Sequence, residues 1–328
     1  MTAQEKILHL FTQVKELSVK EIVEKLNVSK QTVHIVLNRL LAESKVKRLG
    51  RPPKTVYRLA DERSSINPPD TITIDDTTRA ILNENFLVVT ETGNLLEGID
   101  AFTYWCKQRK QPVEKTLREF LTTREKYTRY YSPDGVINGM EKLRNTKGYN
   151  KIWLDDIYYL DFYAIERFGK TKLGTLLHYA KQGQNKFLMT KMMKEAKPKI
   201  IALVNSLKAD AVGFVPPTIR RELQIMKFIQ SDLKLSLPVM DIKKLSGIIP
   251  IPQKSLNNLD ERVRNAEATF AVTEQRKFEH VVLIDDAVGS GATLNEIAEK
   301  IKDKGVAQKV TGLAIIGSFK GFDVITDV

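Results

Sequence analysis

Apolar residues recur at helical spacing in three short segments at the start of the chain. The segment QEKILHLFTQV predicts one amphipathic helix, and SVKEIVEKL predicts a second with Ser18 as its N-cap. After a tight NVS turn, SKQTVHIVLNRLLAES predicts a third helix, which Ser29 caps. The residues that this third helix is expected to bury are Val33, Val36, Leu37, Leu40 and Leu41.

Period-two alternation follows in KVKRLGRPPKTVYRLA, on both sides of the turn GRPPK. The pattern predicts two strands, at 46–49 and 55–59, joined as a wing. Two helices joined by a tight turn, the second with polar and basic residues outside, form a helix-turn-helix whose second helix enters the major groove of DNA. The alternative is a winged helix that binds protein. The residues expected to contact duplex DNA are Ser29, Lys30, Gln31, Thr32, His34, Asn38, Arg39, Lys47, Arg48, Arg51 and Lys54.

The middle of the chain shows mostly helical patterns. The segment DERSSINPPDTITIDD predicts a linker, and ENFLVVTETGNLLEG predicts a strand–turn–strand. Helical patterns run from Ile99 to Tyr131 and from Trp153 to Met193, and they are rich in aromatic residues. We interpret these aromatics as helix core, with stacking on nucleobases as the alternative. The expected domains are a winged helix-turn-helix at 1–62, a linker and mainly helical region at 63–196, and an α/β domain at 197–328.

Strands and helices alternate in the last third of the chain. The segments AVGFVPP, LPVMDIKKL, HVVLIDD and KVTGLAIIGSF predict strands, with helical patterns between them. Such alternation predicts an α/β fold with a parallel sheet, in which ligands bind beyond the carboxyl ends of the strands. The diproline Pro216–Pro217 and the acidic pair Asp285–Asp286 both follow strands, so we expect both at that edge.

The stretch VVLIDDAVGSGAT carries residues suited to a ribose and a phosphate. The carboxylates of Asp285 and Asp286 can accept hydrogen bonds from a ribose diol, directly or through Mg²⁺ and its waters. Gly289 and Gly291 allow a tight turn with inward amides, and the N-terminus of the next helix favours a phosphate. The stretch therefore predicts a monophosphate cradle with a diol clamp. It is not a Walker A loop, because no Gly-Lys-Ser/Thr follows.

Composition and charge narrow the classes of protein. The net charge is +12, from 52 lysines and arginines against 40 acids, and the segment 28–60 is strongly basic. Charge alone leaves a polyanionic partner and a solvated lysine-rich surface equally open. With Cys106 as its one cysteine, the chain forms no intramolecular disulfide, and four scattered histidines disfavour a Cys/His metal site. No long apolar run predicts a signal peptide or membrane span, so we expect a cytoplasmic protein without membrane contact.

VVLIDDAVGSGAT closely resembles the phosphoribosyl-pyrophosphate (PRPP) signature of type I phosphoribosyltransferases. The resemblance implies that Asp285 and Asp286 serve the ribose hydroxyls and hold Mg²⁺ together with PRPP, and that residues 289–293 bind the 5′-phosphate. It also places VPPTIRR at the position of the family's pyrophosphate loop. The expected PRPP-binding residues are Asp285, Asp286, Ala287, Val288, Gly289, Ser290, Gly291, Ala292, Thr293, Pro216, Pro217, Arg220 and Arg221.

A second segment, PQKSLNNLDERVRNAEATFAV, resembles the ComF branch of this family, which has been linked to DNA uptake. In the wider family this loop closes over the active site, so the resemblance implies that Lys254 reaches the pyrophosphate. The expected catalytic residues are then Asp285, Asp286 and Lys254. Two features depart from the branch: the chain lacks its cysteine-rich zinc element, and Ser290 replaces the usual threonine of the loop.

The first domain resembles the winged-helix domains of bacterial and archaeal transcription regulators. Joined to a transferase-like domain, it gives a multidomain layout similar to that of the Gram-positive purine repressor. We favour a DNA-binding regulator that responds to PRPP or a nucleotide. An active phosphoribosyltransferase and a ComF-like DNA-handling factor are the alternatives, and whether catalysis occurs is left open. Because winged-helix regulators usually dimerise, a homodimer is a further hypothesis.

Overall fold

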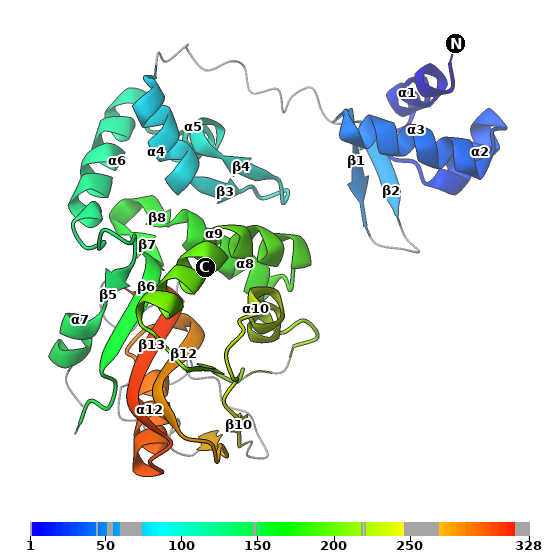
Figure 1. Cartoon of the computed structure of the whole chain (residues 1–328). Coiled ribbons are helices and arrows are strands. Elements are labelled where there is room, and N and C mark those ends of the chain that lie inside the picture. Colours follow the sequence, from blue (N-terminus) through cyan, green and yellow to red (C-terminus); the bar gives the residue numbers. More distant parts are fainter. Residues whose placement is uncertain are drawn as a thin grey trace. The chain divides into compact units, whose positions relative to one another are not determined.

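Two compact units make up the protein, residues 1–73 and residues 74–328 (Figure 1). The computed structural model describes residues 2–43, 45–50, 55–59, 74–146, 149, 151–217, 219, 221–245 and 269–318.

The first unit consists of three helices and an antiparallel hairpin, coloured blue in Figure 1. Ser18 and Ser29 cap the second and third helices, as the sequence predicts. Their hydroxyls accept hydrogen bonds from the amides of Glu21 and Thr32, at 3.3 and 3.1 Å. Asn27 has a left-handed φ of 50°, which turns the chain sharply between these helices. The elements are α1 (Ala3–Gln13), α2 (Val19–Leu26), α3 (Lys30–Ala42), β1 (Val46–Leu49) and β2 (Val56–Leu59).

One apolar core holds this unit together. Leu17 and Tyr57 exchange two backbone hydrogen bonds, of 2.9 and 2.8 Å, which attach the segment before α2 to β2. The turn of the wing, with Arg51 and Lys54, lies outside the described residues. The buried side chains of the core are Ile7, Phe11, Leu17, Ile22, Val33, Leu37, Leu40, Val46 and Tyr57.

A five-stranded mixed sheet forms the centre of the second unit (Figure 1). Its strand order is β5-β6-β13-β12-β9, and β5 alone is antiparallel to its neighbour. The strands predicted at AVGFVPP, HVVLIDD and KVTGLAIIGSF are confirmed as the parallel strands β9, β12 and β13. The segment LPVMDIKKL was expected to be a further strand of this sheet, but its strand β10 (Ile242–Lys244) pairs antiparallel with β11 (Phe270–Val272) in a separate two-stranded sheet. The antiparallel edge strand β5 makes the large sheet mixed. The strands are β5 (Ile137–Asn138), β6 (Asp156–Phe162), β9 (Ala211–Phe214), β12 (Phe278–Val288) and β13 (Ala307–Gly317).

Strand β6 corrects the sequence analysis, which expected a helix from Trp153 onward. Consecutive residues Tyr159 and Leu160 are both buried, because β6 lies inside the sheet and is covered on both faces. Such a strand has no period-two alternation and is easily taken for a helical segment. The segment expected to be a mainly helical middle region thus supplies a strand to the sheet that carries the acidic pair.

Helices cover both faces of this sheet. Ile284 and Leu313 share a buried core with α8, α9 and α10. Gly312, next to Leu313 on β13, faces the other way, because successive strand residues alternate. A side chain on Gly312 would meet Leu294 of α12, which places α12 on the opposite face. The four helices are α8 (Lys172–Gln182), α9 (Lys186–Ser206), α10 (Ile225–Leu233) and α12 (Ala292–Asp303).

Three helices and a hairpin precede the sheet in the chain. The hairpin confirms the predicted strand–turn–strand around Gly93. An aromatic cluster joins the helices: the rings of Phe86 and Phe102 lie 5.1 Å apart, and those of Phe120 and Phe168 lie 5.2 Å apart. These elements are α4 (Asp76–Asn85), β3 (Leu87–Val89), β4 (Leu95–Glu97), α5 (Gly98–Gln108) and α6 (Val113–Thr128).

The expectation that these aromatics form helix core is confirmed for Tyr127 of α6. Three others are buried but lie in or directly after strand β6, and Tyr130 is an exception at 43% exposed. The buried ones are Tyr127, Tyr159, Phe162 and Tyr163. The short elements of the unit are α7 (Met140–Asn145), β7 (Ala164–Ile165), the 3-10 helix η2 (Glu166–Phe168), β8 (Gly169–Lys170), β10 (Ile242–Lys244) and β11 (Phe270–Val272).

Candidate nucleic-acid interface and ligand site

Helix α3 presents five of the eleven predicted DNA-contacting side chains on its exposed face. Ser29 and Thr32 are used in the N-cap, with their hydroxyls 2.8 Å apart. Arg39 donates from Nε to the Glu43 carboxylate at 3.0 Å, so this guanidinium already has a partner. The exposed residues of the predicted set on α3 are Lys30, Gln31, His34, Asn38 and Arg39.

The wing adds basic side chains beside α3. Arg48 on β1 is exposed and Lys47 is half-buried. One exposed residue of α3 is absent from the predicted set: Ile35, whose side chain is 62% exposed. Its position off the buried stripe was visible in the sequence, but an apolar residue among polar ones was not expected to lie outside.

At the carboxyl edge of the large sheet, the diproline and the acidic pair come from neighbouring strands. Strands β9 and β12 are parallel, with Phe214 opposite Ile284. The amide of Val215 donates to the carbonyl of Ile284 at 2.9 Å, so Pro216 and Pro217 begin directly beside the strand that carries the acids. The expected adjacency of these two segments is therefore present.

The two members of the acidic pair differ in exposure: Asp285 is half-buried and Asp286 is buried. Asp286 is 5% exposed and forms an ion pair with the Lys181 ammonium of α8. Its amide donates to Oδ1 of Asp285 at 2.8 Å. Burial, followed by the nearby Asp286 carboxylate, raises the pKa of Asp285 to about 7, although Lys181 acts in the opposite direction. The site thus holds a carboxyl group that exchanges its proton near neutral pH.

The loop between β12 and α12 has the geometry of a tight turn onto a helix N-terminus. Gly291 has a φ of +90°, which only glycine adopts without strain. Helix α12 begins at Ala292, whose amide donates to Oγ of Ser290 at 3.3 Å. Amides at a helix N-terminus favour a negative charge, which agrees with the predicted phosphate cradle.

Two side chains from the segment before β6 form hydrogen bonds with the backbone of this loop. The ammonium of Lys142 donates to the carbonyls of Gly289 at 3.1 Å and of Ser318 at 2.5 Å. The hydroxyl of Tyr149 donates to the carbonyl of Ser290 at 3.0 Å. Burial lowers the pKa of Lys142 to about 8. Two carbonyls of the loop, those of Gly289 and Ser290, are thereby occupied by side chains from this segment.

Arg221 departs from the expected role. The family resemblance placed Arg221 in the pyrophosphate loop as a PRPP-binding residue, and the next helix, α10, begins four residues after it, at Ile225. Its guanidinium donates to the carbonyl of Lys181 and to Oε1 of Gln182, so it holds the C-terminus of α8. Arg220 and the ComF-like segment with Lys254 lie outside the described residues.

Of three further polar residues around this edge, two carry no signal in the sequence that would place them there. Lys181 and Lys142 come from helices that the sequence gave no reason to place at the site. Asp161 is the last residue but one of β6, and it accepts hydrogen bonds from the Tyr131 hydroxyl and from the amide of Phe162, the latter at 2.8 Å. Burial raises the pKa of Asp161. An acid near the end of an apolar run was the available signal.

The acidic pair supplies oxygen donors of the kind that Mg²⁺ prefers. Among the described residues, no group of three or more histidine, cysteine or acidic side chains is arranged to hold a metal. Magnesium at Asp285 and Asp286 would therefore take most of its remaining oxygens from a ligand and from water, which fits an ion that arrives with a diphosphate.

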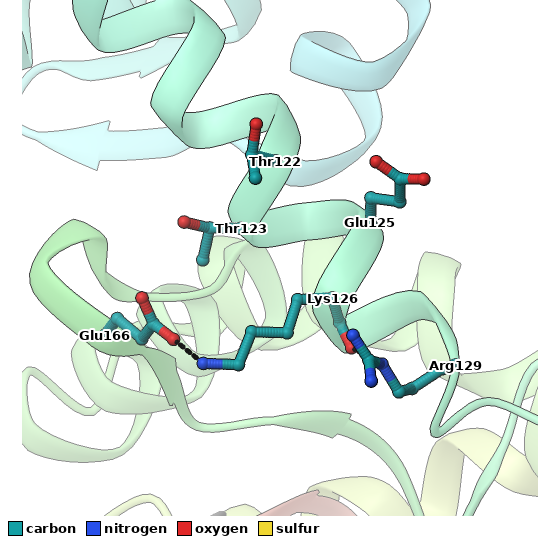
Figure 2. A pocket seen from close by; sticks show the side chains of 6 residues that line it. All are labelled: Thr122, Thr123, Glu125, Lys126, Arg129 and Glu166. Atoms are coloured by element: carbon teal, nitrogen blue, oxygen red, sulfur yellow. Dashed lines mark hydrogen bonds and ion pairs between the residues drawn. The ribbon is translucent and has the colours of Figure 1, made fainter.

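A separate pocket of about 380 Å³ lies between α6 and η2. Figure 2 shows the ammonium of Lys126 directed at Glu166, at 2.5 Å, and Glu125 pointing away. Arg129 donates from Nε to the carbonyl of Lys126 at 2.8 Å. Both cations of this pocket are already engaged, and it contains no residue of the expected ligand site. The chemistry of the carboxyl edge makes that edge the better candidate for an anionic ligand.

Comparison with known families supports the assignment of the first unit. Residues 4–49 match the DeoR-like helix-turn-helix domain. Together with the capped pair α2 and α3 and the hairpin, this match identifies a DNA-binding helix-turn-helix domain of the kind found in transcription regulators. A comparison with curated proteins found no match. Among the described residues, no helix is both long enough and apolar enough to cross a membrane.

Proposed function

We propose that the protein is a transcription regulator that binds duplex DNA through α3 and the wing, and whose DNA affinity responds to PRPP or a nucleotide bound in the second unit. The observation that carries the ligand part is the meeting of three features at one sheet edge. These are the acidic pair, the small-residue loop at the N-terminus of α12, and the diproline strand end beside them.

In this proposal the ligand lies across the carboxyl edge. The amides of residues 289–293 hold the 5′-phosphate, and Asp285 and Asp286 accept hydrogen bonds from the ribose hydroxyls. Mg²⁺, when bound with PRPP, neutralises part of the diphosphate charge. The ion pair of Lys181 with Asp286 supports a ligand-dependent change, because a ribose and its cation compete with the ammonium for the same carboxylate.

The test is a titration of the full chain with PRPP and Mg²⁺, monitored by duplex DNA binding. We expect DNA affinity to change by about 5- to 150-fold, the usual range of inter-site coupling. The variant Asp286→Asn should bind DNA as before without ligand and lose the response. The exposed Asp134 provides the matched control, since Asp134→Asn should respond like the natural chain. DNA affinity that stays constant at saturating PRPP and Mg²⁺ would rule out PRPP as the effector and leave DNA binding by the first unit intact.

Catalytic phosphoribosyl transfer is the second candidate function, and the position of the acidic pair beside the diproline strand end favours it. The residues of the edge would stabilise the charge that develops as pyrophosphate leaves. Pyrophosphate release in the same titration, with a panel of nucleobases added, measures this activity. Its absence with every base would leave the regulator as the function.

A further inference from the structure

The exposed face of α3 carries one apolar side chain where polar ones are expected. Ile35 is 62% exposed, and in the described part of the first unit the other exposed large apolar side chain is Val14, at 36%. Single apolar residues are common on protein surfaces, so exposure alone carries no conclusion. The position of Ile35 does, because it lies on the helix that a helix-turn-helix inserts into the major groove.

Packing explains why Ile35 faces outward. Val33, Leu37 and Leu40 bury the opposite face of α3, and Ile35 contributes nothing to the core that they form. At helical spacing Ile35 shares its face with Gln31, four residues before it, and with Asn38, three residues after it. In the described part of this unit, therefore, no core contact requires an isoleucine at this position.

The neighbours of Ile35 have a defined base chemistry. Gln31 and Asn38 carry amides, and an amide donates to and accepts from the major-groove edge of adenine. An aliphatic side chain contacts the thymine C5 methyl in the same groove. Arg39 would suit guanine, but its Nε is engaged with Glu43 at 3.0 Å. Gln31 and Asn38 are seven residues apart, which is about 10 Å along the helix axis and spans roughly three base pairs.

We propose that Ile35 is a specificity-determining residue that contacts a thymine methyl in the major groove, flanked by adenines that Gln31 and Asn38 contact. The occupant is duplex DNA, as the basic side chains Lys30 and Arg48 beside this face favour a polyanion. This inference rests on the DNA-binding part of the proposed function and is independent of the ligand site.

The test uses a duplex enriched from a random library by the full chain. Each thymine is replaced in turn by uracil, introduced as deoxyuridine, which removes the C5 methyl and leaves the hydrogen-bonding pattern intact. We expect affinity to fall about fourfold at one or two positions, the factor that matches one buried methyl group. The variant Ile35→Ala should bind the thymine and uracil duplexes equally well.

Val14→Ala is the matched control, because it removes an exposed apolar side chain from the same unit but not from α3. It should keep the full preference for thymine. The inference is overturned if the natural chain binds the uracil duplexes as tightly as the thymine duplex at every position. It is also overturned if Ile35→Ala keeps the preference for thymine. Both outcomes leave DNA binding itself intact. If no duplex is enriched at all, the DNA-binding function fails and the inference fails with it.

Discussion

Asp285 keeps its proton at pH values where an aspartate of an unfolded chain has lost it, because burial and Asp286 raise its pKa to about 7. Between about pH 4 and pH 7 the unfolded state therefore binds fewer protons at this position than the folded state. The stability of the second unit decreases as pH rises through this window, and the effect is complete above the folded pKa. Two adjacent ionised carboxylates repel each other, and a cation bound between them would reduce this repulsion.

Replacing Asp285 by asparagine removes this dependence. We compare the free energy of unfolding of Asp285→Asn with that of the natural chain at pH 5 and at pH 8. The difference should shift in favour of the variant by roughly 2–3 kcal/mol from the lower to the higher pH. Urea denaturation at the two pH values measures the difference. Asp134→Asn, at an exposed position, should show no such gain. An Asp285→Asn variant whose advantage is the same at both pH values would contradict a proton held by Asp285.

The residues that the sequence could predict at the site are those contiguous in one motif. Asp285, Asp286 and the loop after them form one such run, so a ligand site could be predicted there from the sequence alone. Lys181 lies 105 positions from its partner Asp286, and Lys142 lies 147 positions from Gly289. Lysines are abundant in this chain, and nothing local distinguishes these two from solvated ones. Arg221 was misplaced for the same reason, since its partner is a backbone carbonyl 40 positions away.

The turn from β12 into α12 depends on contact with α7 as well as on its own conformation. Gly291 has a φ of +90°, and a methyl group there would approach Cδ1 of Leu143 to 2.9 Å. Gly93 has a φ of +78° with no atom within 4 Å of such a methyl group. An alanine at Gly93 would therefore meet backbone strain alone, whereas an alanine at Gly291 would meet both backbone strain and a steric clash.

We expect Gly93→Ala to destabilise the chain by about 1 kcal/mol through strain alone, and Gly291→Ala by roughly 2–3 kcal/mol, because Leu143 must also move. Chemical denaturation of the two variants measures both values. If the proposed PRPP site is correct, Gly291→Ala should in addition weaken PRPP binding, and Gly93→Ala should leave it unchanged. Equal losses of stability in the two variants would show that the contact with α7 carries no weight.

Helices and strands that are marked by residues within their own segment could be predicted. Elements whose pattern depends on what packs against them in the fold could not. The capping serines of α2 and α3 and the alternating hairpin of the wing are local, and the structure confirms them. Strand β6 was taken for a helix because both of its faces are covered, which removes the alternation that marks a half-exposed strand. The antiparallel edge strand β5 is two residues long and leaves no pattern to recognise.

The two units have separate cores, so they should fold and unfold independently. One core is built from α1–α3 and the hairpin, and the other from the large sheet with α8, α9 and α10. We expect residues 1–73 and residues 74–328, produced separately, to give melting curves whose sum reproduces that of the full chain. Calorimetry of the three samples makes the comparison. A second unit that does not fold without the first would contradict this independence.

The position of β13 has a consequence for the newly made chain on the ribosome. This strand is synthesised after β12, yet it lies between β6 and β12 in the sheet. Until Gly317 has emerged, β6 and β12 have no common neighbour and Lys142 has no Ser318 carbonyl to hold. The first unit has all its core residues by Tyr57, so it can fold while most of the chain is still unmade. A message that stops before Ala307 would thus yield a folded helix-turn-helix attached to a chain that cannot assemble its sheet.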